Sequence, residues 1–300
     1  MRFRKAGKIA DNLWYLGREE SGTYYLEGKN GAVMINGGLS YILPDVLKQM
    51  KEFGLNAAKV TRFLILHSHF DHVGIVPYFK RTYPDIEVLA SAAAWNIFAN
   101  PKYITVMNSF SQLSARQAGS GEALQGYDAD WRDDITGTTI SEGNKIDLGG
   151  VTLDILETPG HTNCSVTAYE PNMKALFPTD AAGIPYRELL FPSMNTNAIQ
   201  YLESLEKKMK PLPVSIFCAD HYGYITGDEA ATVVDKTIQE GRKWKAYLEE
   251  YYRKYGGDID ASSKAINDFF YKEFPGYFIA PDILEGVFKQ MFKFVAKTIQ

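Results

Sequence analysis

The chain of 300 residues is poor in two residue types, with only two cysteines and five histidines. Two cysteines cannot build the disulfide framework of a small secreted domain, and they suit a reducing compartment as buried thiols. The two cysteines are also not clustered in the sequence, which argues against a structural zinc finger. The formal net charge is −4, and no long basic run offers a surface for nucleic acid or for an anionic membrane. We therefore expect neither nucleic acid nor a membrane as a partner.

Long apolar runs are missing as well. No stretch approaches the length of a membrane-spanning helix, and the basic N-terminal segment lacks the apolar core of a signal peptide. The cytoplasm is therefore the expected location. Hydrophobic residues make up 45% of the chain and charged residues 23%, which is typical of a globular protein with a full core. This composition favours a small-molecule partner.

Strand and helix patterns predict an α/β region that is followed by a helical tail. Short apolar stretches that end at glycine or turn residues predict strands at 12–17, 23–28, 32–38, 61–67 and 86–91. The segment from about 100 to 139 has mixed character and is interpreted as a partly helical insertion. A Pro-Asn pair at 171–172 predicts a hairpin turn. We predict an α/β domain over 1–227 with this insertion, and a second, helical region over 228–300.

The tail has no strand pattern. Apolar spacing predicts three helices there, at 228–255, 260–273 and 281–300. These helices are rich in Trp, Tyr and Phe, most of which we expect in a core. The sequence leaves open whether the helices cover a site or form the interface of a homodimer.

Three of the five histidines fall within the stretch HSHFDH at 67–72. If 61–67 is a strand, His67 and His69 point to the same side at its C-terminal end. Asp71 and His72 follow where the chain turns towards a helix. For an isolated pair of histidines an ordinary structural role is the better explanation, and Asp71 alone is equally well explained as a helix cap.

The other two histidines change this balance. His161 and His221 each follow an apolar strand at a turn, and so does Asp180. Loops at the strand ends of α/β sheets converge on binding sites. Five imidazoles and two carboxylates can hold two divalent metal ions, and this donor set suits zinc, iron or manganese. We expect two divalent ions, with Zn as the first choice and Fe or Mn as alternatives.

The order and spacing of these residues resemble the motif set of the metallo-β-lactamase superfamily, and specifically its glyoxalase II-like dinuclear type. The resemblance implies a four-layer αββα sandwich whose dinuclear site lies at one edge of the two sheets. It also implies a ligand assignment, in which the first metal is bound by His67, His69 and His161, the second by Asp71, His72 and His221, and both by a bridging Asp180.

Two positions are informative by comparison with this superfamily. Asn36 opens an Asn-Gly-Gly turn where many members have Asp-Thr-Gly, a departure that lies outside the ligand set. His69 stands where the flavodiiron oxygen reductases of the superfamily carry glutamate. Redox chemistry is correspondingly disfavoured.

Two dications would lower the pKa of a shared water and supply hydroxide, so hydrolysis is the predicted reaction. Asp71 is the candidate catalytic residue, which orients the nucleophile and accepts its proton. Tyr222 or Tyr186 is a candidate for stabilising the oxyanion, with packing as an equal alternative. Because the motifs offer no further general acid, a thiolate or a ring-opened alcohol is a better leaving group than an amine. Thioesters and lactones are therefore favoured over lactams.

A closer resemblance covers nearly the whole chain. Stretches such as HFDHVGIVPYFKRTYPDIEVLAS and YLESLEKKMKPLP resemble the aminobenzoylacetyl-CoA thioesterases of alkylquinolone signalling. This implies a C-terminal helical cap, a regulatory partner and iron as a competitor of zinc. It also implies pocket-wall residues, with core packing as their alternative: Phe70, Leu189, Phe191 and Phe278.

The predicted function is an enzyme, a dinuclear metal-dependent hydrolase of a small-molecule thioester such as an acyl-CoA. One alternative is a lactonase or another ester hydrolase of the same fold. The other is a signalling protein that retains a metal site.

Overall fold

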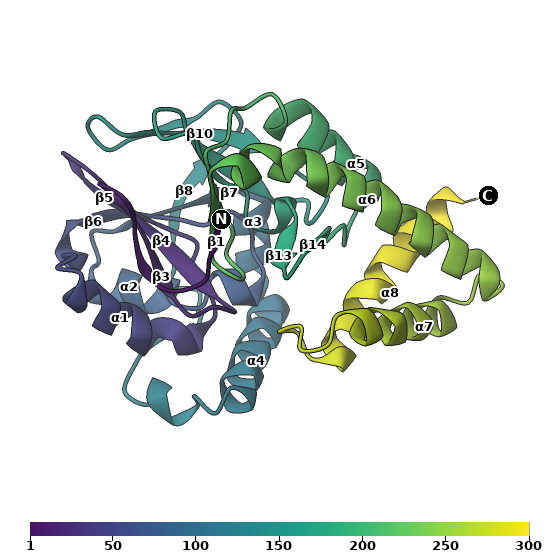
Figure 1. Ribbon diagram of the computed structural model, residues 1–300. Coiled ribbons are helices and arrows are strands. Elements are labelled where there is room, and N and C mark those ends of the chain that lie inside the picture. Colours follow the sequence, from purple (N-terminus) through teal and green to yellow (C-terminus); the bar gives the residue numbers. More distant parts are fainter. Residues whose placement is uncertain (300) are drawn as a thin grey trace. The chain divides into compact units, whose positions relative to one another are not determined.

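The computed structural model describes residues 1–299 and divides into two compact units; Figure 1 labels many of the helices and strands. Unit 1 consists of Met1–Glu157, Cys164–Thr179 and Pro213–Ala231. Unit 2 consists of Thr158–Asn163, Asp180–Leu212 and the described residues from Thr232 onward. Each unit is therefore built from three separate stretches of chain.

The first sheet of unit 1 has seven strands in sequential order. They are β2 (Gly7–Ala10), β3 (Leu13–Gly17), β4 (Gly22–Gly28), β5 (Gly31–Ile35), β6 (Val60–Leu64), β7 (Glu87–Ser91) and β8 (Gly137–Ile140). Strands β2 to β5 pair antiparallel, whereas β5 to β8 pair parallel. All five strands that the sequence predicts in this region are present, but β6 ends at Leu64 and not at residue 67. The first histidine therefore lies on a loop.

The second sheet of unit 1 also has seven strands, in the order β1-β16-β15-β12-β11-β10-β9. They are β1 (Arg2–Phe3), β9 (Lys145–Asp147), β10 (Thr152–Glu157), β11 (Val166–Glu170), β12 (Ala175–Phe177), β15 (Ile216–Cys218) and β16 (Tyr224–Thr226). Strands β11 and β12 form the hairpin predicted from the Pro-Asn pair. The pairing of β12 with β15 is parallel.

The two sheets pack face to face through a shared apolar core. Leu64 and Tyr24 of the first sheet belong to one buried cluster with Leu153 and Phe177 of the second, and the Tyr24 and Phe177 ring centroids lie 5.4 Å apart. Because strand side chains alternate, the neighbouring Phe63 faces the opposite side, in a second cluster that includes Phe79. The interior of unit 1 is therefore a β-sandwich.

Helices cover the outer face of the first sheet through this second cluster. They are α1 (Leu43–Glu52), α2 (Val76–Thr82), α3 (Ala92–Phe98) and α4 (Pro101–Gln117). Figure 1 shows α1 and α2 beside strands β3 to β6. Short 3₁₀ turns occur at Ser40–Ile42, Ala57–Lys59, Phe70–His72, Glu122–Leu124 and Thr179–Ala181. The segment predicted as a partly helical insertion contains α4.

Unit 2 combines a two-stranded hairpin with helices. The hairpin pairs β13 (Ile184–Tyr186) with β14 (Leu189–Phe191). The helices are α5 (Ala198–Ser204), which continues as a π-helical turn at Leu205–Met209, most of α6 (Asp228–Lys254), α7 (Ile259–Glu273) and α8 (Pro281–Thr298). The three helices predicted in the tail are confirmed, except that the final residue of the predicted 281–300 helix, Gln300, lies outside the described residues. No described helix is both long and apolar enough to cross a membrane.

Aromatic side chains form the core of unit 2. The Phe191 ring contacts the rings of Trp244, Phe270, Tyr277 and Phe288, with centroid separations of 5.2 to 6.1 Å. Each of these five side chains is at most 5% exposed. The expectation that most tail aromatics pack in a core is met at these positions.

Candidate metal centre

The histidine segment begins where the chain leaves strand β6, and side-chain bonding there explains why the strand stops. The Leu66 N–H donates to Asn36 Oδ1 at 2.8 Å, and the Leu66 carbonyl accepts from Val166 N at 2.8 Å. Neither the N–H nor the carbonyl of Leu66 is therefore available to hydrogen-bond with a neighbouring strand of the first sheet. At the end of the segment, the His72 carbonyl accepts from Gly37 N at 2.5 Å. The segment is therefore held to unit 1 at both ends by hydrogen bonds.

Gly74 closes the segment through a close backbone approach. A Cβ atom at this position would lie 2.2 Å from Ser40 N and 2.7 Å from the Leu39 carbonyl carbon. The Gly74 N–H donates to the Gly38 carbonyl at 2.7 Å. Only glycine fits between these groups, so this position sets how closely the histidine segment packs on the Asn-Gly-Gly turn.

Five of the seven predicted ligands lie in unit 1, and the four imidazole rings among them lie close together. The ring centroids of His67 and His69 are 4.8 Å apart, those of His67 and His72 are 4.1 Å apart, and those of His72 and His221 are 4.9 Å apart. His67, His72 and His221 are at most 1% exposed. The Asp71 side chain is 16% exposed, and it caps no helix, because Ile75 occupies the N-cap of α2.

Three of these residues converge on one point. His72 Nε2 and His221 Nε2 lie 3.2 Å apart, and Asp71 Oδ2 lies 3.6 and 3.5 Å from them. The other ring nitrogens face acceptors, since His72 Nδ1 is 2.7 Å from Asp220 Oδ2 and His221 Nδ1 is 2.7 Å from the Glu20 carbonyl. Both Nδ1 atoms therefore carry the proton, and both Nε2 atoms direct a lone pair to the same point.

This donor set fits a divalent metal ion. Two imidazole lone pairs and a carboxylate oxygen at these separations repel one another, and a shared cation removes that repulsion. Metal–ligand bonds of about 2.0–2.1 Å at tetrahedral angles place ligand atoms roughly 3.3 Å apart, close to the 3.2–3.6 Å found here. Asp71, His72 and His221 can therefore bind one metal ion together.

The remaining two predicted ligands lie in unit 2 and are close to each other. His161 Nε2 is 3.6 Å from Asp180 Oδ2, and His161 Nδ1 donates to the Ser193 carbonyl at 2.8 Å. Again Nδ1 carries the proton and Nε2 presents the lone pair. Gly160 has φ +135°, and a Cβ there would lie 2.3 Å from Tyr201 N, so the loop that carries His161 packs directly on α5.

Asp220 is a residue of this region that the sequence did not single out. It is 3% exposed, lies between β15 and His221, and accepts hydrogen bonds from Asn36, Thr179 and His72. Its position directly before a candidate ligand was the only signal available. A buried carboxylate behind a metal-binding imidazole fixes the orientation and tautomer of that ring.

Helix α4 borders the histidine segment. The Tyr103 hydroxyl donates to the Ser68 carbonyl at 2.8 Å, and burial raises the pKa of Tyr103 to about 12. The Phe70 ring stacks on Phe110 of α4, with centroids 5.5 Å apart and an interplanar angle of 26°. Phe110 is 38% exposed and its helix neighbour Val106 is 50% exposed. An apolar, partly exposed surface therefore adjoins Asp71 within unit 1.

The other predicted pocket residues have defined contacts of their own. The Tyr222 ring lies under the Arg4 guanidinium at 5.5 Å in unit 1. In unit 2, the Tyr186 hydroxyl donates to the Pro275 carbonyl at 2.6 Å. The remaining three lie in unit 2 as well: Leu189 and Phe191 are buried in β14, and Phe278 is half-buried beside Tyr277. The roles of these five residues towards a substrate stay predictions.

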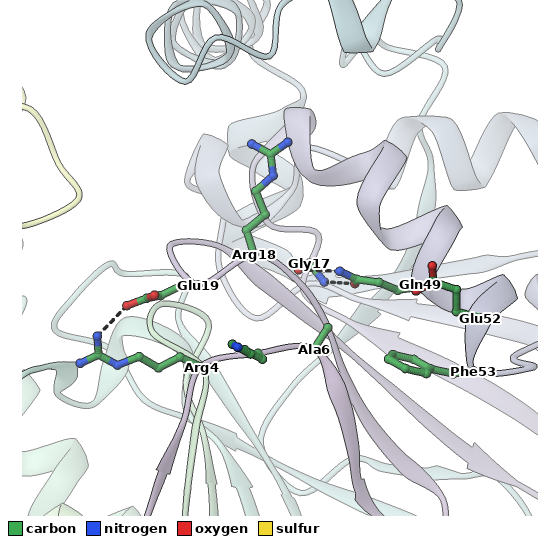
Figure 2. Close-up of a pocket in the computed structure, with 9 residues that line it drawn as sticks. Arg4, Ala6, Gly17, Arg18, Glu19, Gln49, Glu52 and Phe53 are labelled. Atoms are coloured by element: carbon green, nitrogen blue, oxygen red, sulfur yellow. Dashed lines mark hydrogen bonds and ion pairs between the residues drawn. The ribbon is translucent and has the colours of Figure 1, made fainter.

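A hollow of about 460 Å³ lies elsewhere on unit 1. Two interactions lie within its own wall and are drawn in Figure 2: Arg4 donates to Glu19, and the Gln49 amide bonds both the N–H and the carbonyl of Gly17. None of the described residues that line it is a candidate ligand. The hollow is thus separate from the metal-ligand group of unit 1.

The chain is similar to known proteins over most of its length. The model of the metallo-beta-lactamase superfamily matches residues 17–221, about two thirds of the chain. The chain is 24% identical over 195 residues to a metallo-beta-lactamase fold-containing protein of Sulfurisphaera tokodaii, covering 63% of this chain and 68% of that protein. It is 25% identical over 234 residues to an uncharacterized protein of Aquifex aeolicus, covering 75% and 91%.

Solved structures share the fold at lower identity. A metallo-beta-lactamase family protein of Thermus thermophilus superposes with a TM-score of 0.69 at 17% identity, covering 97% of this chain and 95% of the other. The rubredoxin oxygen:oxidoreductase of Desulfovibrio gigas superposes with a TM-score of 0.61 at 16% identity, covering 84% and 70%. These likenesses confirm the predicted α/β fold. By its sequence match and its fold, the chain belongs to the metallo-beta-lactamase superfamily.

Proposed function

We propose that this protein is a dinuclear metal-dependent hydrolase that cleaves a thioester, with a lactone or another ester as the nearest alternative substrate. The observation that supports it most is the convergence of Asp71 Oδ2 with the Nε2 atoms of His72 and His221. Superfamily membership adds support, because members are typically dinuclear metal hydrolases. Cys164 and Cys218 are buried thiols, which agrees with a reducing compartment such as the cytoplasm.

The proposed ligands are the seven residues of the sequence motif. His67, His69, Asp71, His72 and His221 lie in unit 1, and His161 and Asp180 lie in unit 2. Zinc is the first choice, and iron or manganese are the alternatives, because imidazole and carboxylate donors suit all three. Bound there, two dications supply hydroxide at neutral pH and polarise a carbonyl oxygen.

Asp71 is the proposed catalytic residue. One of its oxygens faces His72 and His221, and a carboxylate's second oxygen is free to orient the nucleophile and to accept its proton. Its 16% exposure keeps it accessible to a substrate from solvent. Phe70 directly precedes it in the chain, and the stack of the Phe70 ring on Phe110 offers an apolar surface. We propose that the acyl portion of the substrate lies on this surface.

Oxygen reduction is the competing chemistry, since one structural neighbour is an oxygen:oxidoreductase. His69 argues against it, because the flavodiiron oxygen reductases of this superfamily carry glutamate at that position. The likeness to that neighbour, at 16% identity, reports the fold and leaves the reaction open.

The test is a substrate panel with protein of measured metal content. Acyl-CoA thioesters, lactones and the β-lactam nitrocefin are compared, each with and without a chelator. We expect chelator-sensitive turnover of thioesters, weaker turnover of lactones and the weakest of nitrocefin. Protein that carries two metal ions and hydrolyses no ester or thioester would contradict the proposal. In that case an Asp71→Ala variant that keeps its effect in cells would support the signalling alternative.

A further inference from the structure

The carboxylate of Asp220 is the centre of a buried hydrogen-bond network in unit 1. Its Oδ2 atom accepts from His72 Nδ1 at 2.7 Å and from Thr179 Oγ1 at 2.7 Å. The same oxygen accepts from Asn36 Nδ2. Asp220 is 3% exposed, so these three donors replace water around a buried charge, as a buried carboxylate requires.

The network extends from Asp220 to a second histidine through Thr179. Thr179 Oγ1 lies 3.2 Å from His67 Nδ1. A hydroxyl has a single proton, and the carboxylate is the strongest acceptor in reach, so Thr179 donates to Asp220. Its lone pairs then accept from His67, which places the proton of that ring on Nδ1. The Asp220 carboxylate thus fixes the tautomer of His72 directly and the tautomer of His67 through Thr179.

Backbone strain is concentrated around this carboxylate. Within residues 1–299, five non-glycine residues have positive φ, and three of them lie in or beside the network: Asn36 (+56°), Thr179 (+49°) and Tyr222 (+62°). A β-branched threonine is rare in this region of backbone space. Strain of this kind persists where the surrounding structure enforces it, usually at functional sites. Here it places the Thr179 hydroxyl and the Asn36 amide on the same oxygen.

We propose that Asp220 is a positioning residue that holds both His67 and His72 with the proton on Nδ1, so that both rings present Nε2 to metal. The inference rests on the proposed metal centre, which assigns these two histidines to different ions. A single buried carboxylate would then couple the geometry of both metal positions. This goes beyond an ordinary carboxylate–histidine pair, which orients one ligand only.

Asn36 explains how one carboxylate suffices. Its Oδ1 accepts from Leu66 N at 2.8 Å while its Nδ2 donates to Asp220. An amide can accept and donate at the same time, whereas an ionised carboxylate can only accept. An aspartate at position 36, as many superfamily members have, would keep the bond to Leu66. It would also place two buried carboxylates side by side, where they repel each other. In this chain the carboxylate stands at position 220 and the amide at position 36.

Nitrogen NMR of the five histidines in metal-free protein tests the tautomers directly. At about pH 8, above the ordinary histidine pKa of about 6.5, ring ¹⁵N shifts distinguish protonated from unprotonated nitrogens. We expect protonated Nδ1 and unprotonated Nε2 in both His67 and His72, and loss of this preference in Asp220→Asn. A wild-type protein with the proton on Nε2 of either ring would overturn the proposal, as would an Asp220→Asn protein with unchanged tautomers.

Chelator competition gives a second readout. We expect Asp220→Asn to weaken metal binding by about 10- to 100-fold, whereas the control Asp11→Asn, at a fully exposed position, leaves it unchanged. Asn36→Asp should weaken binding as well, and the exchanged double variant Asn36→Asp/Asp220→Asn should regain part of the loss. A purely structural role would lower the unfolding midpoint in all variants but leave the affinity of folded protein unchanged.

A further pair covers the case in which Asp220→Asn does not fold. Thr179→Val removes the hydroxyl and Thr179→Ser keeps it, so only the first should release the His67 tautomer. Equal tautomer ratios in the two variants would overturn the proposal. Since the tautomer measurements use metal-free protein, an absence of hydrolysis would count against the proposed function and not against this inference.

Discussion

The histidine segment of unit 1 and the aromatic core of unit 2 are both buried, but different forces order them. In and around the histidine segment, ring nitrogens meet specific acceptors, as when His72 faces Asp220 and the neighbouring His221 faces the Glu20 carbonyl. In the aromatic core, Phe191 and its neighbours meet edge to face at 5.2 to 6.1 Å, with no polar partner required. Directional hydrogen bonds order the histidine segment, and the packing of aromatic rings orders the core of unit 2.

This difference predicts different responses to substitution. Removing a polar group from the histidine segment should change chemistry or metal affinity while the fold survives. Removing a ring from the aromatic core should lower stability while the chemistry of folded protein survives. The following experiments test this separation in order of the expected effect.

Asp71→Ala should have the largest effect. We expect kcat/KM for the best thioester to fall by about 10²- to 10⁴-fold, because a positioned acid or base contributes that much, while the unfolding midpoint of metal-free protein stays close to that of wild type. Steady-state kinetics and thermal unfolding measure the two quantities. Asp11→Ala is the control, since that side chain is fully exposed. Full activity in the Asp71 variant would remove it from the mechanism.

Phe191→Ala should act in the opposite way. Loss of a ring that is 1% exposed and touches four other rings should lower the free energy of unfolding by about 3–5 kcal/mol. Urea unfolding measures this loss, and metal content per folded molecule should not change. Phe278→Ala, at a half-buried position, should cost less. A folded Phe191 variant with normal stability but a raised KM would instead support the pocket-wall role predicted from the sequence.

How rare a residue type is in the chain explains which parts of these two regions could be predicted from the sequence. Five histidines, each after an apolar strand, could be assigned together because so few alternatives existed. Aromatic residues are common in the tail, so their spacing predicted α6, α7 and α8 but not the contacts of any one ring. The network around Asp220 escaped prediction because Asn36 and Thr179 approach it only in the folded chain. The end of β6 was misplaced for the same reason, since the Asn36 side chain takes the Leu66 N–H.

Gly74→Ala should lower both the stability and the metal affinity, and each effect should be smaller than those of the two variants above. The added Cβ would lie 2.2 Å from Ser40 N, and overpacking of this kind costs about 1–3 kcal/mol. Because the same contact sets the position of the histidine segment, metal affinity should fall too. Gly7→Ala is the matched control, as its Cβ would meet nothing within 4 Å. Lower stability with unchanged metal affinity would show that the segment tolerates displacement.

Phe110→Ala should have the smallest effect on stability and a selective effect on activity. The side chain is 38% exposed, so little core packing is lost, but its stack with Phe70 disappears. An aromatic pair contributes about 0.5–1.5 kcal/mol, which corresponds to roughly 2- to 10-fold in kcat/KM. We expect this loss for long or aromatic acyl thioesters and not for acetyl thioesters, with Phe53→Ala, exposed to the same extent elsewhere on unit 1, as the control. An equal loss of kcat/KM for acyl chains of all lengths would place the acyl group away from Phe70. The histidine segment would then bind metal without offering an apolar surface to the substrate.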